Sequence, residues 1–174
     1  MYRSQAPQWD RLLLAFVRHN ELFAESNSAT YGAPEVTLAS PIKDQPTLQM
    51  RPGADLALVS LRAEAGRVRV SLTTAGNIDR QVTYGLLGHS PQSSGPAAWE
   101  VKVTGSRGVL TWVEEGKLRT QSLRAKVQGE TLSVDLPGEL AEGHLMMVEA
   151  LTMLGRRYLD HTATEEVELE EETP

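Results

Sequence analysis

The stretch Gly88-His89-Ser90 is the part of the sequence that most resembles a catalytic motif. A serine nucleophile on a strand-to-helix elbow needs a glycine two residues before the serine and another two residues after it, because the backbone turns sharply there. Position 92 is Gln92, and Pro91 follows the serine directly. No helical pattern follows before Trp99, so no helix N-terminus is available to hold an oxyanion. We therefore interpret residues 85–95 as a loop and predict no catalytic residue in it.

The rest of the chain offers no other reactive constellation. It contains no cysteine, which excludes thiol nucleophiles, thiolate metal sites and disulfides. The four histidines are His19, His89, His144 and His161, and no two of them have the spacing of a helical metal site. His144 falls on the apolar side of a predicted helix, where it is either a hydrogen-bonded core histidine or a pH-sensitive contact. No phosphate-binding glycine motif occurs. We expect no metal site and no cofactor, and a protein that is not an enzyme.

Length and charge favour one domain with an acidic end. The chain has 174 residues, of which 40% are hydrophobic, and this is enough for one packed core. No apolar run is long enough to span a membrane, and no signal peptide precedes the first element, so we expect a cytoplasmic protein. Residues 161–174 contain six glutamates and no base, whereas acids and bases balance in residues 1–160. We therefore predict a disordered acidic tail at 161–174 after a single domain at 1–160.

The elements that must position any site are predicted to form an α+β fold. Apolar residues recur at helical spacing in 8–25 and again in 139–159, which predicts an amphipathic helix at each end. Between them, alternation and turn residues predict an antiparallel sheet of about five to seven strands, onto which the C-terminal helix packs. The predicted strands are 55–64, covered on both faces, and 67–74, 99–104, 109–114, 117–127 and 130–136. Residues 26–54 form a long irregular connection with one short edge strand at 35–39, and 77–87 is either a short helix or a loop.

Two groups of side chains are candidates for binding. A basic set lies on the face of the predicted strands opposite to their apolar side chains. It comprises Arg62, Arg67, Arg69, Lys102, Arg124 and Lys126. If these strands share one sheet, the cations gather on one face and attract phosphate backbones. The other group, Met147, Leu151 and Leu154, lies on the apolar stripe of the C-terminal helix and is a candidate contact for a partner helix. A solvated sheet face and a surface for an acidic protein partner are the alternatives for the basic set, and an ordinary core stripe is the alternative for the apolar group.

The order helix, strands, helix over residues 8–160 resembles the plan of type III secretion chaperone-like domains. These are small acidic α+β dimers that bind partner polypeptides and catalyse no reaction. The resemblance implies a homodimeric chaperone-like or adaptor module, and it carries no residue-level site.

Two functions therefore follow from the sequence. The first is a non-enzymatic protein-interaction module that forms a homodimer and binds a protein partner. The alternative is a protein that binds single-stranded DNA or RNA through the basic sheet face, with the acidic C-terminal tail as a regulator. Neither function requires a membrane.

Overall fold

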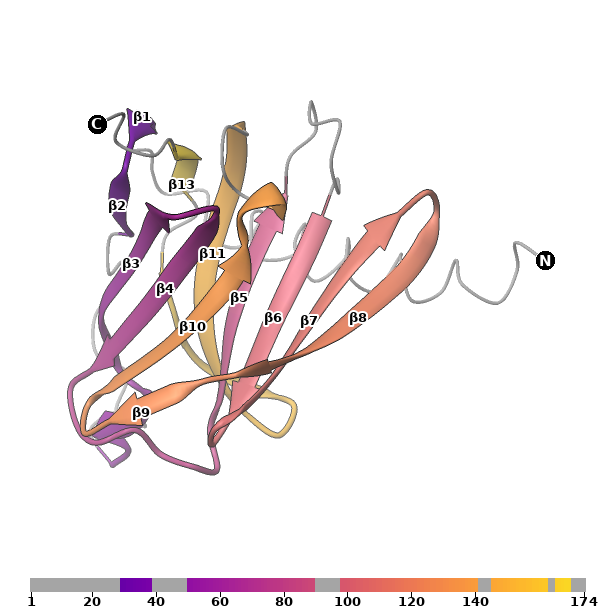
Figure 1. Ribbon diagram of the computed structural model, residues 1–174. Helices are drawn as coiled ribbons and strands as arrows, with labels where there is room; N and C mark the ends of the chain where they lie inside the picture. The colour runs from indigo at the N-terminus through magenta and orange to yellow at the C-terminus, as the bar shows by residue number, and fades with distance from the viewer. Residues whose placement is uncertain (1–28, 39–49, 90–97, 141–144, 163–164, 170–174) are drawn as a thin grey trace.

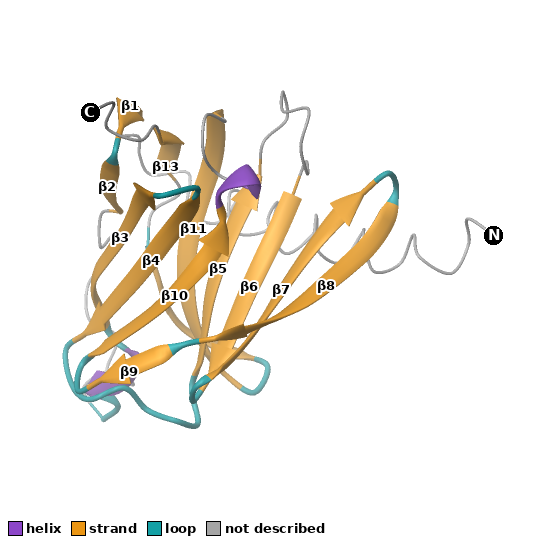
Figure 2. Cartoon of the chain, in the orientation of Figure 1, coloured by secondary structure: helices purple, strands orange, loops and turns teal. Residues whose placement is uncertain are grey.

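The computed structural model describes residues 29–38, 50–89, 98–140, 145–162 and 165–169, and most of these residues lie in β-strands (Figure 1, Figure 2). The described ranges contain two short 3-10 turns, Pro52–Ala54 (η2) and Gly138–Leu140 (η3), and no α-helix. The α+β prediction is therefore wrong, and the described chain is an all-β domain. No helix of the described residues is long and apolar enough to cross a bilayer.

The strands form two sheets. The first sheet has eight strands, with β12 (Arg157–His161) paired to β11 and the others in the order β1 (Ala29–Ala33), β13 (Glu165–Leu169), β11 (Leu145–Leu154), β5 (Thr83–His89), β6 (Ala98–Thr104), β7 (Arg107–Glu114) and β8 (Lys117–Arg124). The second sheet has five, in the order β2 (Glu35–Leu38), β3 (Leu56–Glu64), β4 (Arg67–Thr74), β10 (Thr131–Pro137) and β9 (Lys126–Gln128). The pair β1–β13 is parallel, and every other pair is antiparallel.

The hydrophobic core lies between the two sheets. On β4, Val68, Val70 and Leu72 are buried while Arg67 and Arg69 are exposed, as the alternation of the sequence predicts. One contiguous cluster of buried side chains draws on both sheets. Their inner faces therefore pack on each other as in a β-sandwich, and their outer faces are the surfaces on which a site can be built.

Tight turns explain why neighbouring strands pair in chain order. Ala65 and Gly66 connect β3 to β4 with φ angles of 49° and 70°, and Glu115 and Gly116 connect β7 to β8 with 50° and 71°. Two consecutive residues with positive φ form the hairpin turn whose twist matches that of the flanking strands. The strands predicted at 55–64, 67–74, 99–104, 109–114 and 130–136 are confirmed to within one or two residues, but β3 is covered on one face only, since Leu58 is 48% exposed. The single strand predicted at 117–127 is wrong, because it divides at Ala125 into β8 and β9, which belong to different sheets.

The C-terminal third differs most from the prediction. The helix expected at 139–159 is wrong, because β11 and β12 occupy most of it and Gly155 turns between them with a φ of 60°. β11 is buried on both faces from Val148 to Thr152, and such a strand lacks the polar alternation that separates strand from helix. The disordered tail is also wrong for residues 165–169, which form β13 with Val167 and Leu169 in the core.

The segment 77–87 and the loop predicted at 85–95 are corrected in part. β5 runs from Thr83 to His89, so Gly88 lies within a strand, whereas Ser90 lies outside the described residues. The short edge strand predicted at 35–39 is confirmed as β2, which has only one strand neighbour in its sheet. The N-terminal helix at 8–25, residues 39–49 of the predicted connection and His144 also lie outside the described residues.

Candidate functional site

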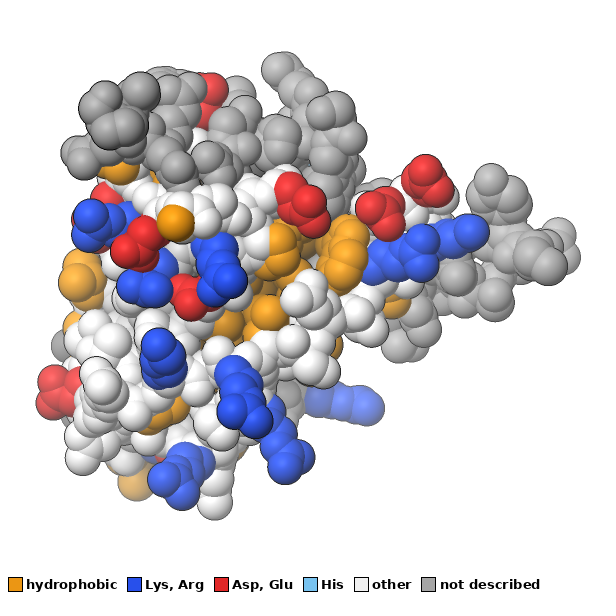
Figure 3. All heavy atoms as spheres, in the orientation of Figure 1, with side chains coloured by type: hydrophobic (Ala, Val, Ile, Leu, Met, Phe, Trp, Pro, Cys, Tyr) orange, Lys and Arg blue, Asp and Glu red, His pale blue; other side chains and the backbone are white. Residues whose placement is uncertain are grey.

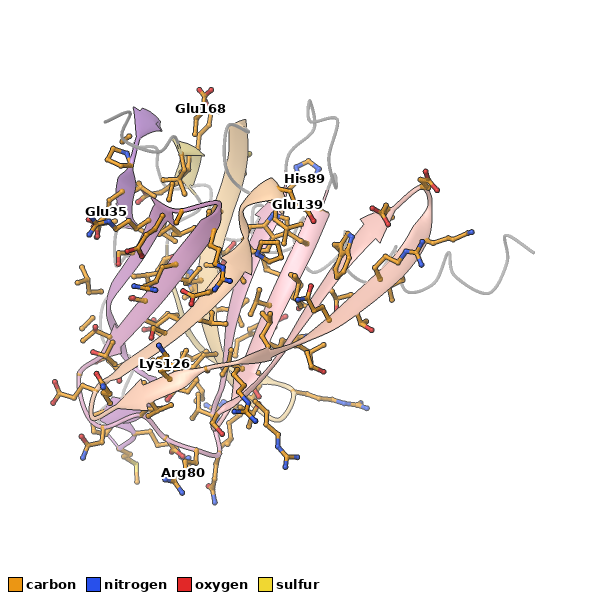
Figure 4. All side chains as sticks on the ribbon, in the orientation of Figure 1. Glu35, Arg80, His89, Lys126, Glu139 and Glu168 are labelled. Atoms are coloured by element: carbon orange, nitrogen blue, oxygen red, sulfur yellow. The ribbon has the colours of Figure 1, made fainter. Side chains whose placement is uncertain are left out.

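The structure brings five of the six predicted basic residues to the second sheet or its rim. These are Arg62 on β3, Arg67 and Arg69 on β4, Lys126 on β9 and Arg124 at the end of β8. Lys102 does not join them, because it lies on the outer face of the first sheet, where its Nζ is 2.9 Å from Oε1 of Glu100. Figure 3 shows Lys and Arg side chains over the visible face of the sandwich with polar surface between them, and Figure 4 labels Lys126 on that face.

A groove of about 300 Å³ lies where the two sheets meet. We call it the corner groove, and it is lined by Arg69, Ser71, Arg124, Lys126, Gln128, Thr131, Ser133, Val134 and Asp135. The chain leaves the first sheet at Arg124 and enters the second at Lys126, so the two cations stand on either side of Ala125. The Ala125 N–H donates to the carbonyl oxygen of Ser106 at 3.1 Å, and this bond fixes the corner. The corner groove is therefore built by a continuous polypeptide that changes sheets.

Strand register places small hydroxyl side chains beside these cations. Ser71 lies opposite Ser133, which in turn lies opposite Lys126. One row further along, the hydroxyls of Thr73 and Thr131 are 3.2 Å apart and share a hydrogen bond. Serine and threonine hydroxyls both donate and accept hydrogen bonds, and short side chains leave a flat surface open to an extended ligand.

Of the three cations in the corner groove, only Arg69 forms ion pairs with described carboxylates. Arg69 is held between two carboxylates, with its Nε 3.0 Å from Asp135 and its Nη1 3.0 Å from Glu64. The hydrogen bond and charge of Asp135, followed by the charge of Glu64, raise the pKa of Arg69 above its ordinary value. Arg124 and Lys126 form no ion pair with any described residue. The groove consequently presents two available cations and one that is already matched.

A second group of polar side chains lies on the outer face of the first sheet. Glu149 on β11 is fully buried, and its Oε1 is 3.8 Å from Nδ1 of His161. The His161 Nδ1 is also 2.9 Å from the carbonyl oxygen of Thr162, which accepts a hydrogen bond when Nδ1 carries the proton. His89 lies on the neighbouring strand β5, and burial lowers the pKa of its imidazole. Among the described residues, no three His, Cys, Asp or Glu side chains gather as a metal site would require.

The predicted partner-helix contacts are corrected, since all three lie on a strand. Met147 and Leu151 lie on the face of β11 away from the main core and pack in a small cluster with Leu87 of β5, whereas Leu154 packs against the main core. They form no common stripe for a partner helix. Sequence reasoning missed the groove hydroxyls Ser71, Thr131 and Ser133, although the alternation of Ser and Thr with Val and Leu in β4 and β10 marks them as outward-facing.

Comparison with protein-family models, with curated proteins and with solved structures finds no match to this chain. The resemblance to type III secretion chaperones is not tested by these comparisons. Its architectural basis includes a helix after the sheet, and residues 145–154 and 157–161 are strands. The function must therefore be argued from the chemistry of the surfaces.

Proposed function

We propose that the protein is a non-enzymatic binding module and that the corner groove binds the phosphate groups of a nucleic acid strand. The observation that carries the proposal is the pair Arg124 and Lys126, which have no described carboxylate partner and stand beside a row of hydroxyls. Phosphate oxygens accept charge-assisted hydrogen bonds from such cations and further hydrogen bonds from Ser and Thr. The proposal retains the cytoplasmic location expected from the sequence.

The chemistry of the groove is suited to binding and not to turnover. Among the described lining residues the only carboxylate is Asp135, which is engaged by Arg69, and none is a histidine. A hydroxyl nucleophile needs a free base within hydrogen-bond reach, and the described lining offers none to Ser71 or Ser133. The described lining also contains no aromatic side chain on which a base could stack. Recognition should therefore be of the backbone and largely independent of sequence.

The salt dependence of binding gives a quantitative test. If Arg124 and Lys126 each neutralise one phosphate of a single strand, the slope of log K against log salt should be about −1.4. Affinity should then fall about sevenfold between 50 and 200 mM salt. Loss of both available cations removes both contacts, so the slope should fall close to zero.

The experiment measures fluorescence anisotropy of a labelled single-stranded 20-mer DNA at these salt concentrations. The double variant Arg124→Glu/Lys126→Glu should weaken binding by at least about tenfold, because each charged hydrogen bond contributes about 1.5 kcal/mol or more. Lys102→Glu is the matched control, since it makes the same kind of charge reversal on the opposite face. An equal loss in the control, or binding that does not weaken with salt, would contradict the proposal.

A protein-interaction module is the second candidate, and a different observation favours it. The long exposed strand β8 ends one edge of the first sheet, which is a surface for a polypeptide partner. The homodimer expected from the sequence belongs to the same candidate. Sedimentation velocity at two protein concentrations tests it, and a monomer at both concentrations would exclude the dimer.

A further inference from the structure

Strand β8 forms an edge of the first sheet. It pairs with β7 along its whole length of eight residues, and no strand of the described residues pairs with its other side. Six of its eight side chains are exposed, and only Leu118 and Leu123 are partly buried. In Figure 1 the tip of the β7–β8 hairpin extends beyond the second sheet. Edge strands of this length are uncommon because their backbone groups can pair with another chain.

Hairpin geometry identifies the backbone groups that face the open side. Glu114 and Lys117 close a two-residue turn, so their backbone groups bond to each other. Along β7 and β8, hydrogen-bonded residue pairs then alternate with pairs that are not hydrogen-bonded. At the other end of the hairpin, the Ala125 N–H donates to the Ser106 carbonyl oxygen, at a position where this alternation requires a hydrogen-bonded pair. The N–H and C=O groups of the four residues Leu118, Thr120, Ser122 and Arg124 therefore point away from β7.

The charges of β8 determine which chain can pair with it. The strand carries Lys117, Arg119 and Arg124 and contains no acidic residue. Arg119 also reaches Glu114, with its Nε 3.3 Å from Oε2, but this ion pair is exposed and weak. Pairing two copies of β8 would bring six cations together with no acidic residue on either strand, and this repulsion is destabilising. A second copy is therefore a poor occupant.

We propose that β8 receives an extended acidic segment of a partner protein, which adds to the first sheet as a further strand. Lys117 and Arg119 are two residues apart and lie on the same face of the sheet, so the segment should carry acidic side chains at alternate positions. The main chain of the segment would bond to the open groups of β8, and its carboxylates would pair with the two cations. This inference rests on the second candidate function, the protein-interaction module, and does not depend on nucleic-acid binding in the corner groove.

The test uses the full chain and a fluorescein-labelled peptide of eight residues in which glutamate alternates with threonine. Anisotropy should report binding of this peptide, with at least tenfold weaker binding of a peptide in which lysine replaces glutamate. Thr120→Pro should also weaken binding at least tenfold, because proline lacks the N–H that faces the open edge. Thr120→Ala keeps that N–H and should bind as the wild type does.

Hydrogen–deuterium exchange on the wild type provides a second measurement that needs no proline. The peptide should slow exchange at the amides of Leu118, Thr120 and Ser122, whereas the amides of β5 should not change. Unchanged binding by Thr120→Pro, or unchanged exchange at these amides, would overturn strand addition. Equal binding of the lysine peptide would overturn the selection for acidic segments. A concentration-dependent dimer that Thr120→Pro abolishes would show that a second copy occupies the edge and would also overturn the proposal.

Discussion

The glycine of the Gly-His-Ser stretch makes the most sharply defined prediction about the fold. Gly88 lies opposite Trp99 across the β5–β6 pair, and the indole is 1% exposed. A Cβ at position 88 would lie 2.2 Å from Cε2, 2.3 Å from Cζ2 and 2.6 Å from Nε1 of that ring. The substitution Gly88→Ala therefore cannot be accommodated unless the indole moves by more than about 1 Å, since interior carbon atoms pack about 3.5 to 4 Å apart.

Two costs follow from that displacement. Overpacking a closely packed core costs about 1 to 3 kcal/mol. The indole N–H donates to the carbonyl oxygen of Leu140 at 3.1 Å, and losing this buried bond costs about 1 to 3 kcal/mol more. Gly88→Ala should thus lower the free energy of unfolding by about 2 to 6 kcal/mol, which corresponds to a fall in Tm of about 4 to 24 °C.

Urea unfolding followed by tryptophan fluorescence and circular dichroism measures this loss. Gly85→Ala on the same strand is the matched control, because its Cβ would meet the flexible end of Leu151 at 2.9 Å. In the background Trp99→Phe, whose smaller ring leaves room for a methyl group, Gly88→Ala should cost at least about 1 kcal/mol less, as contacting residues couple by that amount. Additive effects, or a loss as small as that of the control, would refute the reasoning.

Two further predictions concern buried polar groups. Tyr84→Phe should destabilise the fold by about 1 to 3 kcal/mol in urea unfolding, because the buried hydroxyl donates to the Gly53 carbonyl oxygen and accepts from the Asp79 N–H at 2.9 Å; no change would contradict this. Burial raises the pKa of Asp160, whose Oδ2 accepts from the Leu56 N–H at 2.7 Å. The folded state thus disfavours the charged carboxylate, so Asp160→Asn should raise stability at pH 7. That gain should vanish below about pH 3, where the carboxyl is neutral in both the folded and the unfolded wild type. A gain that persists there would argue against this cause.

The strands between residues 55 and 136 other than β5 were predictable because they alternate between buried and more exposed side chains, whereas β5 is buried on both faces. Val68, Val70 and Leu72 alternate with polar residues, and this period of two is specific to a half-buried strand. β11 carries no such signal from Val148 to Thr152, since both of its faces are buried. Its apolar residues fit a helical stripe equally well, and only pairing with distant β5 decides the outcome.

The candidate site was predictable only in its charge. The outward positions of Arg62, Arg67 and Arg69 follow from alternation, but membership of a sheet depends on pairings between residues far apart in sequence. Residues 117–127 read as one strand in the sequence, and the change of sheet at Ala125 has no local signal beyond a small residue. This change creates the corner groove, and sequence reasoning could not locate it.

The sheet edges indicate why the charges of β8 matter for function. β2 has four residues and β9 has three, and edges so short offer little backbone to a second chain. β8 has eight residues, so it is long enough to pair with another chain. Its cations are the feature of the strand that opposes such pairing. Cations repel another copy of β8 and impose a desolvation cost on apolar strands, but they favour an acidic strand. In the proposed complex, the side chains that disfavour self-association would therefore also select the partner, and at Arg124 the edge strand β8 runs directly into the corner groove.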